Sequence, residues 1–374
     1  MTGHVLVAPD KFKGSLSAAE VAEAVVAGLR GRMPSAAVRA TPVADGGDGT
    51  VRAALATGRF ERSPVRVTGP TGRRVDAEIA VSDTTAVVEL ASASGLALLA
   101  PGEFDPLRAS SHGTGELVAA ALDAGVREIV LGVGGSACTD GGAGMLTALG
   151  ARFTDIAGNP LSPGGGGLER IAGADLSGLD PRLWGVDLVL ASDVDNPLCG
   201  SSGAAHVYGP QKGASSEQVR RLDGALERFA EILGRVTGES SADRPGAGAA
   251  GGVGYGAMTA LSARFRSGSD VVLELVDFDR DLAGTALVVT GEGALDEQTL
   301  HGKVPAAVAA RAAKAGVPTV AVAGKCSLSR QRLRDGGFAA VYALAHLQPD
   351  PARSIEGAAA LLHRVGEHIA DDFL

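Results

Sequence analysis

The sequence is poor in lysine and in aromatic residues. Of its 374 residues only six are lysine, against 28 arginines, and only 13 are aromatic: nine Phe, three Tyr and one Trp. A core with so few rings has to be built from Ala, Val, Leu and Ile, which suits helices packed on a parallel sheet. Hydrophobic residues still make up 45% of the chain, so a globally disordered protein is excluded.

Other scarcities exclude further classes of protein. The three cysteines are odd in number and widely spaced, so neither a disulfide framework nor a zinc ribbon is expected. The net charge of −9 argues against a nucleic-acid partner. Uncharged apolar runs stay shorter than about 18 residues, the length of a membrane span, and the N-terminal run is too short for a secretory leader. We therefore expect a cytoplasmic protein without a membrane partner.

Strand and helix patterns alternate through the two ends of the sequence. Ser17 and Glu20 have the spacing of a capping box ahead of a helix, Asp48 is placed to cap a second helix that ends near Thr57, and Pro305 marks a third helix start. Five short apolar runs between the helices are predicted strands: 4–8, 38–43, 286–290, 318–323 and about 339–343. Right-handed crossovers on such an array commonly give a doubly wound parallel sheet of order 2-1-3-4-5.

The middle of the chain has a different character, with antiparallel strand patterns and glycine-rich loops. We predict that 1–60 and 284–374 form one domain, and that 61–283 is a second domain inserted into it. In a doubly wound sheet, ligands bind where the order of winding reverses, so the loops 9–15 and 290–303 are expected to meet a ligand. The active site is expected in the cleft between the two domains.

The scarcity of lysine makes each lysine informative. Five of the six lie in or beside loops rich in glycine, proline or small residues: Lys11, Lys13, Lys212, Lys303 and Lys325. A compact ammonium group can follow a phosphoryl oxygen, whereas arginine suits a static carboxylate. The alternative is chance placement in a glycine-rich chain.

Two N-terminal segments carry charge on flexible backbone. PDKFKGS (9–15) ends where a helix begins, so its amides and two ammonium groups favour an anion site. ADGGDGT (44–50) has two carboxylates on a loop whose glycines allow close approach to a ligand or metal. Ordinary turns use the same residues, so a plain structural role stays open for both.

A third segment, GVGGSACTDGGAG (132–144), follows a predicted strand. It contains a loose dinucleotide fingerprint, with Asp155 about 20 residues further on, which leaves an NAD-dependent oxidoreductase as an alternative. Because the glycines continue past the point where the helix of that motif begins, a phosphate-binding loop is the favoured interpretation. Cys138 has no evident histidine partner and is expected to be a small packed side chain.

A fourth segment pairs Glu292 with Asp296 ahead of Lys303, a pattern suited to Mg²⁺ and polyphosphate. Further loops supply Asp193, Gln211 and Lys212. For any one of these acids a helix cap or an exposed turn is the favoured interpretation, and the case for a site depends on the whole set. Nucleotide-binding P-loop, protein-kinase, HExxH and G-x-S-x-G motifs do not occur in the sequence.

These segments, together with ELASASGLAL, DVDNPLCG, YGPQKGA and VPTVAVAG, closely resemble the type I glycerate kinase family from about residue 5 to 325. The resemblance implies a flavodoxin-like α/β domain interrupted by a larger mixed α/β insertion. It also implies a phosphotransferase that phosphorylates D-glycerate from ATP with Mg²⁺, the 2-position being favoured. Formation of 3-phosphoglycerate and a non-catalytic carbohydrate- or organic-acid-binding regulator stay open as alternatives, as does the choice between monomer and homodimer.

The resemblance also suggests roles. Many members read APDSFKGS where this chain has Lys11, so the resemblance favours Lys13 over Lys11 as the functional lysine. Many also read GGSATNDGG where this chain has Cys138 and Thr139, which argues against a catalytic cysteine. Phosphates or the glycerate carboxylate are expected at Lys13, Ser15, Gly134, Gly135 and Ser136, assisted by Lys11, Asp140, Gln211, Lys212 and Lys303. Asp45, Glu292 and Asp296 are the expected Mg²⁺ ligands. Asp193 is expected to orient or deprotonate the attacking hydroxyl, with Lys13 and Asp45 also catalytic.

Overall fold

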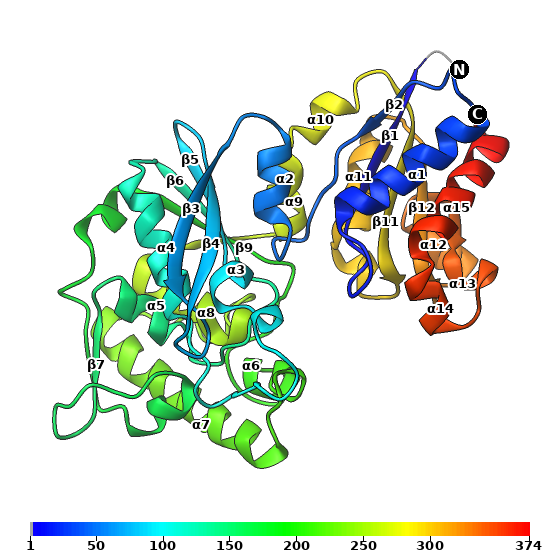
Figure 1. Cartoon of the computed structure of the whole chain (residues 1–374). Helices are drawn as coiled ribbons and strands as arrows, with labels where there is room; N and C mark the ends of the chain where they lie inside the picture. The colour runs from blue at the N-terminus through cyan, green and yellow to red at the C-terminus, as the bar shows by residue number, and fades with distance from the viewer. Residues whose placement is uncertain (1–2) are drawn as a thin grey trace. The chain divides into compact units, whose positions relative to one another are not determined.

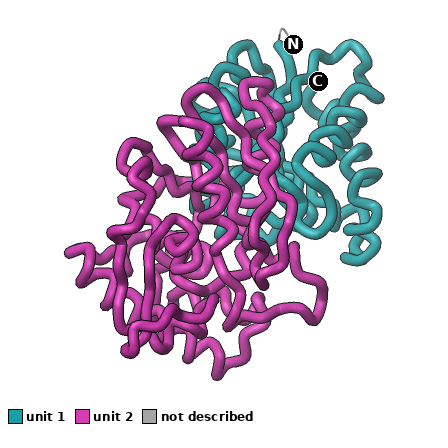
Figure 2. The backbone as a smooth tube through the Cα atoms, turned by 60° about the vertical axis from the view of Figure 1, so that its left-hand side comes forward, with its two compact units in different colours: residues 1–45, 268–374 teal, residues 46–267 magenta. Residues whose placement is uncertain are grey.

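The computed structural model describes residues 3–374, and the chain divides into two units, which Figure 2 colours separately. Unit 1 contains the described residues up to Asp45 together with Gly268–Leu374, and unit 2 contains Gly46–Ser267. The first and last parts of the chain therefore fold together, and the middle forms a unit of its own.

Unit 1 is built on a five-stranded, wholly parallel sheet of order β2-β1-β11-β12-β13. Its strands are β1 (His4–Pro9), β2 (Val38–Ala40), β11 (Thr285–Leu295), β12 (Thr319–Cys326) and β13 (Phe338–Ala343). Counted along unit 1 alone, this is the predicted order 2-1-3-4-5, so the doubly wound fold is confirmed. The central strands are continuous apolar runs because helices cover both faces of the sheet.

Strand β11 is longer than the sequence predicts. It was expected to end near residue 290, but it pairs with β12 as far as Leu295, and Glu292 lies opposite Ala323. Gly291 allows this pairing, since a Cβ there would lie 2.2 Å from the carbonyl oxygen of Val322. Glu292 is therefore a strand residue rather than a loop residue.

Helices α1 (Ala18–Arg32) and α15 (Ala358–Phe373) lie side by side in unit 1 (Figure 1). Gly28 permits this, since a Cβ there would meet the carbonyl oxygen of His363 at 1.9 Å. The predicted capping box of Ser17 and Glu20 and the proline in the first turn of α11 (Val304–Lys314) are confirmed. The remaining helices of the unit are α9 (Gly268–Leu275), α10 (Phe278–Asp281), η5 (Thr299–His301), α12 (Arg330–Asp335), α13 (Leu344–Leu347) and α14 (Pro351–Glu356).

Unit 2 is built on a six-stranded mixed sheet of order β10-β9-β6-β5-β4-β3. The hairpin strands β3, β4 and β5 run antiparallel, whereas β5, β6, β9 and β10 run parallel. The strands are β3 (Glu61–Thr68), β4 (Arg74–Val81), β5 (Thr85–Glu89), β6 (Glu128–Gly132), β9 (Asp187–Ala191) and β10 (Arg264–Arg266). A separate two-stranded sheet pairs β7 (Arg152–Thr154) with β8 (Gly173–Asp175).

The helices of unit 2 enclose one large apolar core around Leu117, Leu131, Met145 and Phe229. They are α2 (Thr50–Ala56), α3 (Ala91–Ser94), η1 (Leu96–Leu98), α4 (His112–Asp123), α5 (Ala143–Ala148), η2 (Gly165–Arg170), η3 (Pro181–Gly185), α6 (Ala204–Tyr208), η4 (Pro210–Lys212), α7 (Ser216–Thr237) and α8 (Ala249–Leu261). Rings are few, as the composition requires: Phe229 makes edge contacts with Phe153 and Tyr255.

The unit boundaries fall at 45/46 and 267/268, not at the predicted 60/61 and 283/284. Helix α2 packs on β4 and β5 and so belongs to unit 2, whereas α9 packs on α11 and belongs to unit 1. The prediction divided the chain at loops, but apolar helix faces decide which core a segment joins. The predicted cap of α2 at Asp48 is wrong. The N-cap residue is Gly49, with φ of 106°, which has no side chain to accept from the helix amides.

Candidate functional site

Three acidic residues of unit 1 lie on or after neighbouring parallel strands. Asp10 comes directly after β1, and its amide donates to the carbonyl oxygen of Gly291 on β11 at 2.8 Å. Glu292 lies on β11, and Asp45 ends the segment that follows β2. Because β1 and β11 are the strands between which the winding reverses, these acids lie at the position where doubly wound sheets bind ligands.

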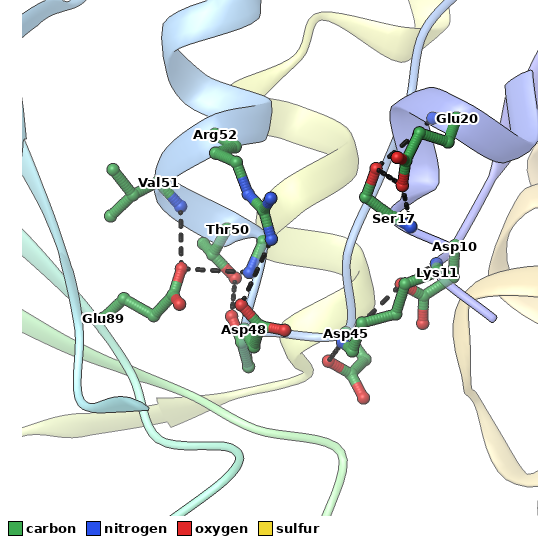
Figure 3. Close-up of polar contacts among 12 residues, drawn as sticks. Asp10, Lys11, Ser17, Glu20, Asp45, Asp48, Thr50, Val51, Arg52 and Glu89 are labelled. Carbon is green, nitrogen blue, oxygen red and sulfur yellow. Dashed lines mark hydrogen bonds and ion pairs between the residues drawn. The ribbon is translucent and has the colours of Figure 1, made fainter. Parts of the chain in front are cut away.

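The carboxylates of unit 1 influence one another. Burial raises the pKa of Asp10 to about 7, and repulsion from Asp45 adds to the rise. The Lys11 amide donates to Asp10 Oδ1 at 2.7 Å, while Lys11 Nζ lies 3.8 Å from Asp10 Oδ1 and 3.5 Å from Asp45 Oδ1 (Figure 3). Lys11 thus bridges two acids. Sequence reasoning missed Asp10, although an acid directly after a buried strand is a recognisable signal.

Glu292 and Asp296, predicted as a pair, have different surroundings. Burial raises the pKa of Glu292, and its Oε1 accepts from Thr299 Oγ1 at 2.5 Å. Asp296 Oδ1 instead accepts from the amides of Gln298 (2.9 Å) and Thr299 (3.3 Å), so Asp296 caps the turn before η5. Lys303 Nζ lies 3.4 Å from Gln298 Oε1 and attracts the Glu292 carboxylate.

The segment 9–15 is less open to an anion than the sequence indicates. The Glu20 carboxylate accepts from the amide of Ser17 at 2.8 Å, and the amide of Glu20 donates to Ser17 Oγ at 3.3 Å, so the protein's own groups occupy the start of α1 (Figure 3). Ser15 Oγ donates to the carbonyl oxygen of Ile355 at 3.0 Å. Lys13 is exposed.

In unit 2 the structure brings together two glycine loops that the sequence separates by about 85 residues. A Cβ on Gly132 would lie 2.4 Å from the carbonyl oxygen of Gly46, and one on Gly134 would lie 2.6 Å from the Cα of Gly47. Only glycine permits this approach.

Glu89 holds the first of these loops. It is buried at the end of β5, and its Oε2 accepts from the amides of Gly49 (3.1 Å) and Val51 (3.2 Å) at the start of α2 (Figure 3). Sequence reasoning missed Glu89 too, although it ends an apolar strand just as Asp10 follows one.

The loop after β6 lacks the dinucleotide motif considered above. Helix α5 begins only at Ala143, eleven residues after β6 ends at Gly132. Asp155 lies in the turn between β7 and β8, where its Oδ1 accepts from the amides of Ala157 and Asn159, both at 2.9 Å. The strand–turn–helix geometry that the motif requires is therefore missing at this place.

The same loop offers backbone donors. Within residues 3–374, the amides of Gly134, Gly135 and Ser136 have no hydrogen-bond acceptor, and Gly135 is left-handed with φ of 74°. Successive amides around a left-handed residue form a concave site for anions. Asp193 lies two residues beyond β9, at the same sheet edge, since Gly132 is paired with Ala191.

Two buried charged side chains, Asp140 and Lys212, form hydrogen bonds with atoms of this loop. Asp140 is 1% exposed and accepts from five donors: Ser110 Oγ, Ser111 N and Oγ, Gly142 N and Gly144 N. Lys212 is 2% exposed and donates to Ser136 Oγ at 2.9 Å and to the carbonyl oxygen of Cys138 at 2.6 Å. Burial lowers the pKa of Lys212. Both residues were predicted to bind substrate, and that stays a prediction: Lys212 is bonded to atoms of this loop, and Asp140 to this loop and to Ser110 and Ser111.

The remaining predicted residues of unit 2 are placed as follows. Asp193 is half-buried, and its Oδ1 accepts from Ser267 Oγ at 2.9 Å. Gln211 is exposed on η4. Cys138 is buried in the core, and burial raises the pKa of its thiol, as expected of a packed side chain.

The described residues contain no ready-made cage for a metal: residues 3–374 hold no group of three or more His, Cys, Asp or Glu that could bind one. Mg²⁺ rarely needs such a cage, because it keeps several waters and binds through one or two carboxylates together with substrate phosphates. The oxygen donors of Asp45 and Glu292 match that chemistry. No helix in the same part of the chain is long and apolar enough to span a membrane.

Comparison with known proteins agrees with these observations. The model of the glycerate kinase family matches residues 5–374. The chain is 43% identical to a glycerate kinase of Bacillus subtilis over 368 residues, covering 98% of this chain and 96% of that protein. It is 43% identical to the glycerate 2-kinase of Escherichia coli over 342 residues, covering 91% and 90%.

A solved structure extends the similarity to the fold. The crystal structure described as that of a glycerate kinase 2 from Salmonella typhimurium LT2 matches with a TM-score of 0.83 and 42% identity, covering 99% of this chain and 98% of that one. Sequence, fold and the composition of the loops therefore agree, and the chain belongs to the glycerate kinase family.

Proposed function

We propose that this chain transfers the γ-phosphoryl group of ATP to the 2-hydroxyl of D-glycerate, with Mg²⁺ as the metal cofactor. The observation that carries the proposal is the cluster of Asp10, Asp45 and Glu292 at the switch point of the parallel sheet of unit 1. Its oxygen donors suit a cation that accompanies polyphosphate. The similarity to a protein named glycerate 2-kinase favours the 2-position.

Asp45 and Glu292 are the residues we propose for holding Mg²⁺. Bound there, the ion would neutralise charge on the phosphate oxygens. Asp296 supports this arrangement indirectly, because it caps the turn that presents Thr299 Oγ1 to Glu292. Lys11 keeps Asp45 near Asp10. Lys13 and Lys303 supply ammonium groups for phosphate oxygens, and Ser15 positions the loop that carries Lys13 through its bond to Ile355.

In unit 2, the amides of Gly134, Gly135 and Ser136 bind an anionic group of a substrate, and exposed Gln211 contributes from η4. Asp193 orients the attacking hydroxyl and accepts its proton. The hydroxyl oxygen forms the new bond to the γ-phosphorus as the bond to the ADP oxygen breaks in line. Ser267 fixes the Asp193 carboxylate by donating to Oδ1.

Phosphorus NMR of the product tests the proposal. Incubation with D-glycerate, ATP and Mg²⁺ should yield ADP and the doublet of 2-phosphoglycerate, whose phosphate couples to a single proton. A triplet from 3-phosphoglycerate would overturn the assignment of the 2-position. A reaction without added Mg²⁺ and with EDTA should form no ADP. Unchanged turnover would remove the metal from the proposal.

A further inference from the structure

Lys212 is a charged side chain enclosed in the core of unit 2. It is 2% exposed, and burial lowers its pKa although the nearby Asp140 carboxylate attracts its charge. Enclosing an ammonium group costs free energy unless its donors find acceptors. The acceptors here are Ser136 Oγ at 2.9 Å and the carbonyl oxygen of Cys138 at 2.6 Å. Both belong to the loop whose outer amides have no acceptor.

The loop is thereby fixed from its inner side. Lys212 draws the Ser136 hydroxyl and the Cys138 carbonyl inward, and the amide of Ala137 donates to Ser94 O at 2.8 Å. The buried Asp140 carboxylate, two residues beyond Cys138 in the loop, is engaged by its five donors. The amides of Gly134 and Gly135 lie on the outer, more exposed part of the loop.

We propose that Lys212 is a positioning residue, whose ammonium group holds the Ser136–Cys138 turn so that the amides of Gly134, Gly135 and Ser136 stay available to a substrate anion. The inference rests on the proposed function, in which this loop binds an anion. Lys212 acts through the loop and does not touch substrate, because it is enclosed and two of its three N–H donors are directed to loop atoms. Its charge also reinforces the amide dipoles, since low-dielectric surroundings strengthen such effects.

A double-mutant cycle separates this role from direct substrate binding. Lys212→Met removes the charge with similar volume, and Ser136→Ala removes one acceptor. We expect Lys212→Met to lower kcat/KM by about 10- to 100-fold and Ser136→Ala by up to about tenfold, as for hydrogen bonds to a charged group. Since both act on one turn, the double variant should be within about threefold of Lys212→Met. Effects that multiply would overturn the proposal.

The split between KM and kcat excludes a merely structural role. A displaced loop should raise the KM of one substrate, glycerate if the anion is a carboxylate or ATP if it is a phosphate. A loss of folded protein alone would lower kcat and leave both KM values unchanged, which would contradict the proposal. Ser136→Ala, the milder change, keeps the test valid if Lys212→Met fails to fold. Lys314→Met, on the exposed end of α11, is the matched control and should change neither value.

Gly135→Ala separates the anion site of the loop from the positioning role of Lys212. A side chain at this left-handed position strains the loop, so it should raise the same KM if the loop binds an anion. Unchanged KM values for both substrates would overturn the anion site itself. A raised KM in Gly135→Ala, with normal kinetics in Lys212→Met, would retain the anion site and overturn the role of Lys212.

Discussion

The two units present opposite kinds of polar group at the ends of their parallel strands. Unit 1 gathers the carboxylates of Asp10, Asp45 and Glu292, which repel one another. Unit 2 offers the uncharged amides of Gly134–Ser136 and directs its buried charges, Asp140 and Lys212, inward to its own loop. The first arrangement suits a cation with phosphates, the second an anion. Charged residues in glycine-rich loops can therefore face a ligand or bond to the protein itself, and their hydrogen-bond partners distinguish the two cases.

The largest expected effect concerns Asp193, the acid at the strand end of unit 2 that is not enclosed. Replacing it by Asn should lower kcat by about 10²-fold or more, as for loss of a general base, because the amide cannot accept the proton. Steady-state kinetics measure this, with circular dichroism to show that the fold is intact. Near-normal turnover would remove Asp193 from the mechanism and leave unit 2 with anion binding alone.

A second prediction compares the two acids at the end of β11. Glu292→Gln should weaken Mg²⁺ activation and lower kcat/KM by roughly 10-fold or more, since charge-assisted contacts are lost. Asp296→Ala should mainly loosen the turn before η5, at a cost of about 1 kcal/mol of stability, as for loss of a cap. Mn²⁺ binding followed by electron paramagnetic resonance reports the metal directly. Equal weakening in both variants would show that Asp296 is also a ligand.

The buried carboxyl of Asp10 predicts a dependence of stability on pH. Its folded pKa of about 7 lies above the usual 3.8, so the folded state binds the proton more tightly than the unfolded state does. Enclosing this group therefore costs stability progressively as pH rises from about 4 to 7. Asp10→Asn should unfold at higher urea than the unmodified protein at pH 8, and the gain should disappear near pH 4, with EDTA present throughout. A gain of equal size at both pH values would exclude titration of Asp10.

The last prediction concerns the stability of unit 2 and Glu89, which holds the start of α2. Glu89→Ala leaves the amides of Gly49 and Val51 without their acceptor and should cost about 2 kcal/mol of unfolding free energy. Glu89→Gln keeps an acceptor oxygen and should cost less than half as much. Urea titrations of the three proteins decide this. Equal losses in Glu89→Gln and Glu89→Ala would mean that the negative charge, and not the acceptor oxygen, carries the stabilisation.

Much of the fold could be predicted from local pattern. The sheet order of unit 1 followed from five apolar runs and the handedness of crossovers, and the capping box of Ser17 and Glu20 followed from spacing alone. The extension of β11 to Leu295 could not, since it depends on Gly291 fitting against Val322. The unit boundaries could not either, because α2 and α9 join cores that distant strands supply.

The candidate site divides in the same way. The sequence by itself determined the family, the doubly wound sheet and the loops that carry charge, because strand periodicity, helix caps and glycine content are local properties. Only the tertiary structure decided that Asp10 lies with Asp45 and Glu292, that Glu89 holds the start of α2, and that the buried Lys212 and Asp140 find their hydrogen-bond partners within unit 2. A hydrogen bond between residues tens of positions apart depends on how the chain packs, and spacing along the chain does not encode it.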